Sequence, residues 1–117
     1  MKVVALRLRF ALHGCRSLKD KRRRLRGLRD RFGKQTGMAV CESAAANSLR
    51  SAEWTFVAAA SSPTVVAQML DEVGRYAQSS VDAELISEQR SSLASDGAEM
   101  EASVPGSEMP EMPAVRT

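Results

Sequence analysis

The sequence has few of the residues that usually mark a chemical site. Among 117 residues there are five aromatic side chains, two cysteines and one histidine. Cys15 and Cys41 have neither CxxC spacing nor accompanying histidines, so we expect reduced thiols rather than a disulfide framework or a zinc site. The seven glycines are scattered, which excludes a Gly-rich phosphate-binding loop. We therefore expect no catalytic residue, no metal and no cofactor, in a protein that is not an enzyme.

Long apolar segments are also missing. The longest strictly apolar runs, Val3–Leu6 and Phe56–Ala60, fall far short of the roughly 20 residues of a membrane-spanning helix. Arg7 and Arg9 interrupt the region in which a secretory signal would need an apolar core. We expect a cytoplasmic protein that does not contact a membrane.

Charge is abundant but unevenly distributed. Residues 1–35 contain 13 Lys and Arg against two acids, a balance of +11, whereas residues 36–117 contain four Arg against twelve acids, a balance of −8. The formal net charge of +3 therefore describes a polarised chain. Such polarity is typical of proteins with an anionic partner.

Two kinds of apolar periodicity divide the first 90 residues. In residues 2–12 the apolar side chains alternate with a period of two, which predicts a half-buried strand. Ser17 and Ser62, the latter followed by Pro63, provide the caps of two segments with helical apolar spacing. The predicted strands cover residues 2–12, 38–42, 52–59 and 81–89, and the predicted helices cover residues 17–34 and 63–77.

The order β-α-β-β-α-β predicts the fold class α+β. With right-handed crossovers it gives the ferredoxin-like split β-α-β sandwich, a four-stranded antiparallel sheet with two helices on one face. We expect this domain to cover residues 1–91. Residues 92–117 contain three of the four prolines and a net negative charge, which predicts a disordered acidic tail.

The other sheet face is expected to stay open. Strand parity assigns to it the side chains of Val3, Ala5, Arg7, Arg9, Thr55, Val57 and, less clearly, Cys41. A half-apolar open face is typical either of self-association or of a nucleic-acid platform. Phe10, Trp54 and Phe56 have the parity of the core, so we do not expect the stacked bases of an RNA-recognition motif on this face.

The first predicted helix is the leading functional feature. Its apolar stripe of Leu25, Leu28 and Phe32 is narrow, and nearly all the remaining surface is cationic, with Asp20 and Asp30 as the only acids. Cations spaced along a helix can neutralise several phosphates, although a solvated helix face remains the alternative. The candidate nucleic-acid-binding residues are Arg7, Arg9, Lys19, Lys21, Arg22, Arg23, Arg24, Arg26, Arg31 and Lys34.

The segment from Gly14 through Ser17-Leu18-Lys19-Asp20-Lys21-Arg22 resembles the signature of the YlxP-like family of small bacterial proteins of unassigned function. The resemblance covers roughly residues 2–90 and implies a ferredoxin-like fold. Family genes often lie beside genes for transcription and translation factors, which implies RNA or the ribosome as partner. After Glu42 the family tends to carry an Asp-His-Gln-rich stretch, whereas residues 43–49 here are mostly Ala and Ser, so this sequence departs there from the family pattern.

Two hypotheses follow. The first is a non-enzymatic RNA- or ribosome-associated protein that binds through the basic helix. The second is a structural homodimer in which the open sheet face packs on itself and the helix has no nucleic-acid role. An acidic tail that folds back onto the helix is a further alternative.

Overall fold

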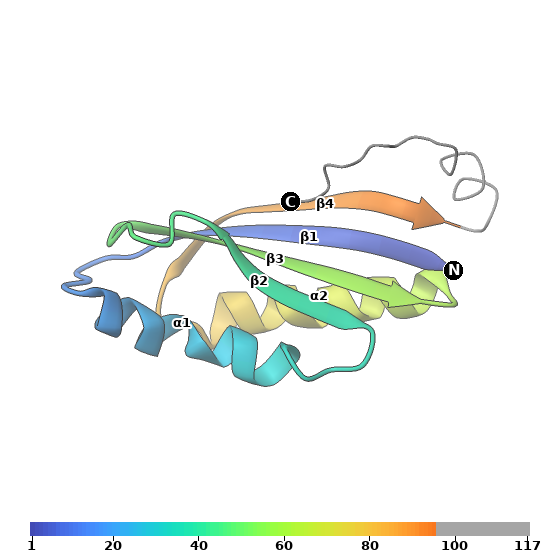
Figure 1. Cartoon of the computed structure of the whole chain (residues 1–117), viewed down its shortest axis with the longest axis horizontal. Coiled ribbons are helices and arrows are strands. Elements are labelled where there is room, and N and C mark those ends of the chain that lie inside the picture. The colour runs from blue at the N-terminus through green and yellow to red at the C-terminus, as the bar shows by residue number, and fades with distance from the viewer. Residues whose placement is uncertain (96–117) are drawn as a thin grey trace.

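The computed structural model describes residues 1–95 and has the expected α+β architecture (Figure 1). Two helices pack on one face of a four-stranded antiparallel sheet, whose strand order is β2-β3-β1-β4. This arrangement confirms the ferredoxin-like prediction. The elements are β1 (Lys2–Ala11), α1 (Leu18–Phe32), β2 (Met38–Ala44), β3 (Ser51–Ala60), α2 (Pro63–Ser79) and β4 (Glu84–Ser95).

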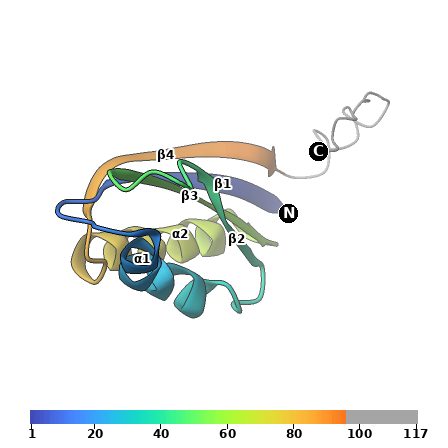
Figure 2. The same ribbon diagram turned by 60° about the vertical axis from the view of Figure 1, so that its left-hand side comes forward.

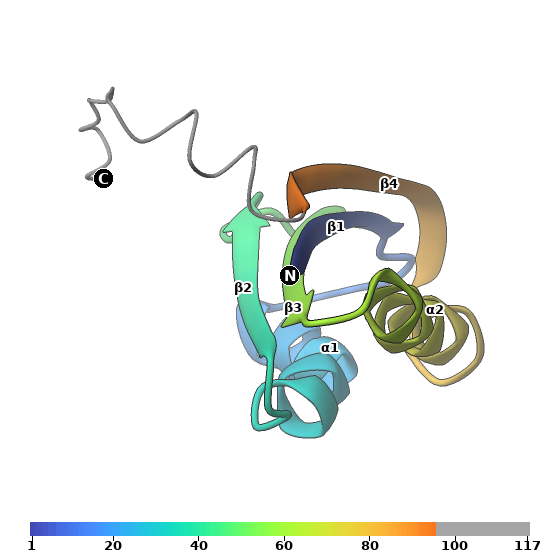
Figure 3. The ribbon, with the colours of Figure 1, turned by 90° about the vertical axis from the view of Figure 1, so that its right-hand side faces the viewer.

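The two central strands, β1 and β3, place the hydrophobic core between the sheet and the helices. β1 and β3 pair over their full length, from Lys2 opposite Ala60 to Ala11 opposite Ser51. Their even-numbered side chains point toward the helices, so Leu6, Phe10 and Phe56 are fully buried. Each such side chain contributes roughly 1.5–3 kcal/mol through the hydrophobic effect. Viewed along the strands, the sheet curls over both helices (Figure 3).

Both predicted helix caps are confirmed. The Ser17 hydroxyl accepts from the Asp20 backbone N–H at 3.0 Å, and the Ser62 hydroxyl accepts from that of Thr64 at 3.2 Å. Such caps satisfy backbone donors that the first helical turn leaves without partners. The helices lie side by side beneath the sheet, with α1 under β2 and β3 and α2 toward β4 (Figures 2 and 3).

The prediction for the last strand was wrong in its bounds. The strand begins at Glu84 rather than residue 81 and continues to Ser95, so residues 92–95 belong to the sheet and not to the predicted tail. Two register shifts in the pairing of β4 with β1 interrupt the alternation of its side chains. Because β4 is an edge strand rich in exposed polar residues, its pattern is not that of a buried strand. The rest of the predicted tail, residues 96–117, lies outside the described residues.

The open sheet face carries the expected side chains. Arg7, Arg9 and Cys41 are exposed, and Val3, Ala5, Thr55 and Val57 are partly exposed. Phe10, Trp54 and Phe56 are buried on the opposite face, so the described part of this face has no aromatic ring for base stacking.

Candidate nucleic-acid interface

Helix α1 presents different surroundings on its two sides. At about 100° per residue, the buried stripe of Leu25, Leu28 and Phe32 separates one side that faces α2 from another that faces the edge strand β2. Basic residues occur on both sides. We call Lys19, Arg22, Arg26 and Arg29, on the β2 side, the outer row, and we call Arg24 and Arg31, on the α2 side, the inner pair.

The inner pair is engaged within the protein. Arg31 donates to the carboxylate of Glu72 at 2.7 Å, and its guanidinium lies 5.3 Å from the ring centre of Tyr76. Arg24 donates to the carbonyl oxygens of His13 at 2.8 Å and Gly14 at 3.3 Å, and its side chain is only 12% exposed. These two predicted phosphate contacts therefore serve mainly to fix α1 against its neighbours.

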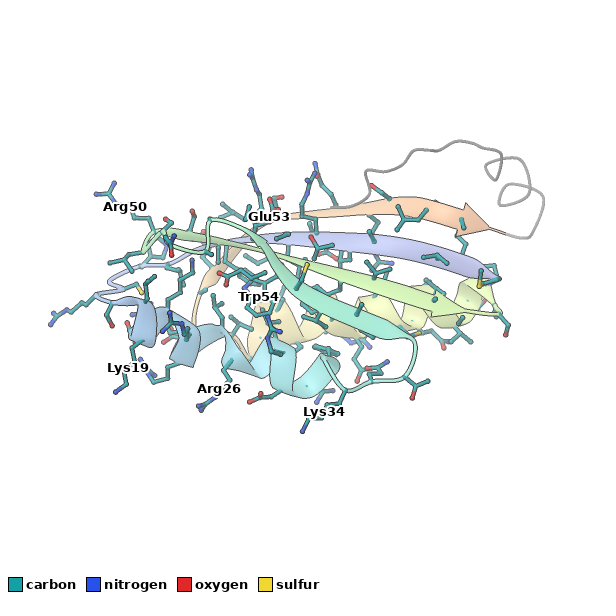
Figure 4. The ribbon with its side chains drawn as sticks, in the orientation of Figure 1. Lys19, Arg26, Lys34, Arg50, Glu53 and Trp54 are labelled. Atoms are coloured by element: carbon teal, nitrogen blue, oxygen red, sulfur yellow. The ribbon has the colours of Figure 1, made fainter. Side chains whose placement is uncertain are left out.

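The outer row has few such partners. Within residues 1–95 the side chains of Lys19 and Arg22 have no ion pair or hydrogen bond. Arg26 approaches Asp30 at 3.6 Å but remains 72% exposed, and a surface ion pair of this kind contributes little. Lys19 and Arg26 point away from the sheet in Figure 4.

The outer row borders a groove of about 830 Å³ between α1 and the β2 edge of the sheet. A smaller hollow of about 130 Å³ adjoins it and shares Arg22, Glu42 and Trp54 with it. The groove is lined by Ser17, Lys19, Asp20, Arg22, Arg23, Arg26, Arg29, Glu42 and Trp54.

Five groove residues were not among the predicted contacts: Ser17 and Asp20 at the start of α1, and Trp54, Arg29 and Glu42. Trp54 lies between β3 and α1 (Figure 4), is 6% exposed, and has a buried indole N–H without a hydrogen-bond partner in the described residues. Arg29 places its guanidinium 5.3 Å from the centre of the Trp54 ring. Glu42 is opposite Trp54 in the β2–β3 register. Helical spacing could have found Arg29, which is three residues beyond Arg26 and seven beyond Arg22.

Lys21 is a correction to the predicted interface. It is 2% exposed, and its ammonium donates to the carbonyl oxygens of Ala45 at 2.6 Å, Ser48 at 2.9 Å and Ser51 at 3.0 Å. The Glu42 carboxylate lies 3.4 Å away. A buried ammonium needs such acceptors to offset its lost hydration, so Lys21 fixes the β2–β3 loop and is not available to a phosphate.

The contacts of Lys21 also account for the backbone conformation of that loop. Ala45 has a φ of 62°, a left-handed conformation that costs a residue with a side chain free energy. Its carbonyl oxygen is one of the acceptors of Lys21. The loop thus contributes backbone carbonyl oxygens to this contact.

Arg7 and Arg9 lie on the open sheet face, apart from the groove. Arg7 donates to Gln89 at 2.6 Å, and Arg9 pairs with Glu53 at 3.1 Å. Hydrogen bonds from Ser43 and then Arg9 hold the pKa of Glu53 below its usual value, against the opposing effect of burial. The structure therefore does not bring these two arginines together with α1.

Arg23 and Lys34 complete the predicted set. Arg23 pairs with Asp20, whose pKa is lowered mainly by that hydrogen bond and further by the charge of Arg24. Lys34 follows Gly33, the C-cap residue of α1, and is exposed, without a side-chain partner in the described residues. Arg23 lines the groove, whereas Lys34 lies beyond it.

Residues 1–95 also contain both cysteines, the histidine and most of the acidic residues of the chain. No three His, Cys, Asp or Glu side chains are grouped there as metal ligands. No described helix is long and apolar enough to cross a membrane. Cys15 and Cys41 are free thiols, and His13 lies 2.7 Å from Glu84 at the exposed turn after β1.

Comparison with known proteins gives a family without an assigned activity. Residues 3–90 match the family described as "Protein of unknown function (DUF503)". The chain belongs to this family. No curated protein matches the sequence. Among solved structures, the chain is similar to the "De novo designed protein Ferredog-Diesel", with a TM-score of 0.45 and 14% identity over 76% of this chain and 83% of the other.

Proposed function

We propose that this DUF503 protein is a non-enzymatic cytoplasmic protein that binds RNA, free or within the ribosome, through the outer row of α1. The observation that carries the proposal is the outer row itself: four cations on one side of one helix, two of them without any partner in the described residues. Successive turns of a helix are about 5.4 Å apart. The row therefore offers a line of positive charge to an extended phosphate backbone.

Phosphate binding explains this charge better than a solvated face does. Solvated helix faces usually carry both signs, in i,i+4 pairs that stabilise the helix slightly. In the outer row only Arg26 has such a pair, with Asp30 at 3.6 Å. Phosphates would supply the missing negative charge, and each contact would release condensed counterions.

The proposal predicts a strong salt dependence. The full chain would be titrated into a labelled single-stranded RNA at several salt concentrations. Four phosphate contacts give a slope of log affinity against log salt of about −3, since each contact to a single strand contributes about −0.7. The double variant Arg22→Ala/Arg26→Ala is expected to reduce the magnitude of this slope by about 1.4.

The matched control is Arg50→Ala/Arg75→Ala, which removes the same charge from exposed positions outside α1. The control should leave the slope nearly unchanged. A flat salt profile of the native chain, or equal slopes for both variants, would contradict RNA binding through the outer row.

The resemblance of residues 14–22 to the YlxP-like signature supports the ribosome as the source of the RNA. A pull-down from native lysate with and without nuclease tests this part. Ribosomal components should be recovered without nuclease and lost after it, and recovery that resists nuclease would point to a protein partner instead.

A homodimer is the second candidate, and the uncovered sheet face favours it. Val3, Ala5 and Val57 lie on that face and are only partly buried. Sedimentation would distinguish a monomer of 12.7 kDa from a species of twice that mass. A dimer that Val57→Lys dissociates would support this interface, and a monomer at tens of micromolar would exclude it. Because the groove lies on the helix side, a dimer would leave RNA binding possible.

A further inference from the structure

Besides Asp20, which pairs with Arg23 and Arg24, the groove contains two groups that a purely phosphate-binding surface does not need. Glu42 and Trp54 face each other across β2 and β3, and both line the groove and the hollow beside it. Directly paired residues on one face of an antiparallel sheet have Cβ atoms about 4.5–5.5 Å apart. A carboxylate and an indole therefore stand together next to the outer row.

Glu42 is an unusual residue among phosphate-binding cations, since a carboxylate repels phosphate. Its side chain is 27% exposed, and one of its oxygens lies 3.4 Å from the Lys21 ammonium. An ionised carboxylate has about four lone-pair sites, so it retains acceptor capacity toward the groove. Toward the groove it can therefore accept from N–H donors such as those of a nucleobase.

Trp54 adds an unsatisfied donor and an aromatic ring. Its indole N–H is buried without a partner in the described residues, and native structures rarely leave such groups unpaired. The Arg29 guanidinium lies over its ring at 5.3 Å. Because the ring is only 6% exposed, a base in the groove would stack on the exposed Arg29 guanidinium rather than on the indole itself.

Guanine fits this combination better than uracil does. Its Watson–Crick edge presents the N1–H and N2–H donors side by side, which matches the two oxygens of a carboxylate, and its O6 accepts from an N–H donor. Uracil instead flanks its single N3–H with two carbonyl oxygens, which a carboxylate repels. The groove volume of about 830 Å³ lies within the range of small-molecule sites, about 300–1,000 Å³.

We propose that the groove binds one unpaired guanine of a single-stranded RNA segment, with Glu42 accepting from the guanine N1–H and N2–H while the outer row contacts the flanking phosphates. This inference rests on the proposed RNA binding and deepens it. Base recognition then occurs on the helix side of the domain, opposite the sheet face used by RNA-recognition motifs.

The test compares U-only heptamers with heptamers that carry a single central guanosine. The full chain is titrated with each RNA at one salt concentration, and binding is followed by the anisotropy of an RNA end label. The emission of Trp54, the only tryptophan of the chain, reports in the same titration whether the base enters the groove. We expect the guanosine RNA to bind about ten-fold more tightly, as for a bidentate side chain–base pair, and to change Trp54 emission.

Two protein variants and one modified base test the contact between Glu42 and the guanine. Glu42→Gln should bring the two RNAs within about two-fold of each other while retaining binding to the U-only RNA. Glu72→Gln makes the same change at an acid that pairs with Arg31 on the α2 side, and it should keep the ten-fold preference. Inosine in place of guanosine removes the N2 amino group and should weaken binding to the native chain by several-fold, independently of any effect of the variants on folding.

Each failure has a distinct meaning. If the native chain binds both heptamers equally, or binds guanosine and inosine RNAs equally, the guanine site is wrong and phosphate binding stands. If Trp54 emission does not change when the guanosine RNA binds, the base is outside the groove and the site is wrong. If neither RNA binds at low salt, the proposed function itself fails. An oligoglutamate peptide of equal charge that binds as tightly as the guanosine RNA would assign the groove to acidic peptides and overturn the inference.

Discussion

The two sides of α1 have similar sequences and different roles. On the α2 side, Arg24 and Arg31 are held by carbonyl oxygens, a carboxylate and an aromatic ring of the same chain. On the β2 side, Lys19 and Arg22 have no partner in the described residues. The number of cations in a helix therefore overstates the charge that it can offer to a ligand, because the fold uses part of that charge for its own packing.

Lys21 is the clearest case of a cation that the fold uses for its own packing. Its replacement is expected to cause the largest loss of stability. Lys21→Met should lower the free energy of unfolding by about 3 kcal/mol, because loop carbonyl oxygens that now accept from the ammonium would lose a buried donor. Urea unfolding followed by circular dichroism measures the change.

The neighbouring Arg22→Met is the matched control. It makes a comparable change at an exposed side chain and should alter the free energy of unfolding by no more than about 0.5 kcal/mol. If both variants were equally stable, the contrast between a structural and an available cation within α1 would be wrong.

Replacement of Gly27, on the α2 side of α1, is expected to cause the second largest loss of stability. A Cβ atom at this position would collide with the Tyr76 hydroxyl, so Gly27→Ala should destabilise the fold by about 1–2 kcal/mol although alanine favours helix. Thermal unfolding measures the change. The double variant Gly27→Ala/Tyr76→Phe removes the colliding oxygen and should recover part of the loss. No recovery would show that α1 and α2 are not packed as described.

Much of the fold could be predicted from sequence because it depends on periodicity. The alternation in β1 and β3, the stripe of Leu25, Leu28 and Phe32 and the two serine caps are local signals, and each is confirmed. The bounds of β4 were wrong because its two register shifts break the alternation.

The candidate site was less accessible to sequence reasoning because it depends on partners distant in the chain. Lys21 looks like its exposed neighbours until the carbonyl oxygens of residues 45–51 are placed around it. Trp54 has the parity of a core residue and is buried, yet it also lines the groove. Such an assignment requires the packing of β2 against α1, which no local pattern encodes.

The ion pairs on the two sides of α1 are expected to contribute less to the free energy of unfolding. Arg31→Ala should destabilise the fold by about 1 kcal/mol, since it loses the Glu72 ion pair and its contact with Tyr76. Arg26→Ala should change stability by less than about 0.5 kcal/mol, because its pair with Asp30 is exposed. Urea unfolding of both variants sharpens the comparison, and a larger loss at Arg26 would reverse it.

The smallest expected effect concerns pH. Because the pKa of Asp20 is depressed in the folded state, its ionised form stabilises the fold above the ordinary carboxyl pKa, and this stabilisation is lost as the pH falls through the folded value. Asp20→Asn should be slightly less stable than the native chain at pH 7, and the two should converge as the pH falls below the folded-state pKa of Asp20. Unfolding at a series of pH values measures this difference, and a constant difference across the series would contradict the assignment.

The most direct test of the account is the RNA affinity of two charge reversals on opposite sides of one helix. Arg26→Glu places a negative charge in the outer row, and Arg31→Glu makes the same change in the inner pair, with both chains first shown to be folded. Affinity for single-stranded RNA at low salt should fall at least ten-fold for Arg26→Glu and less than three-fold for Arg31→Glu. Equal losses, or a greater loss for Arg31→Glu, would show that the β2 side of α1 is not the RNA-binding surface.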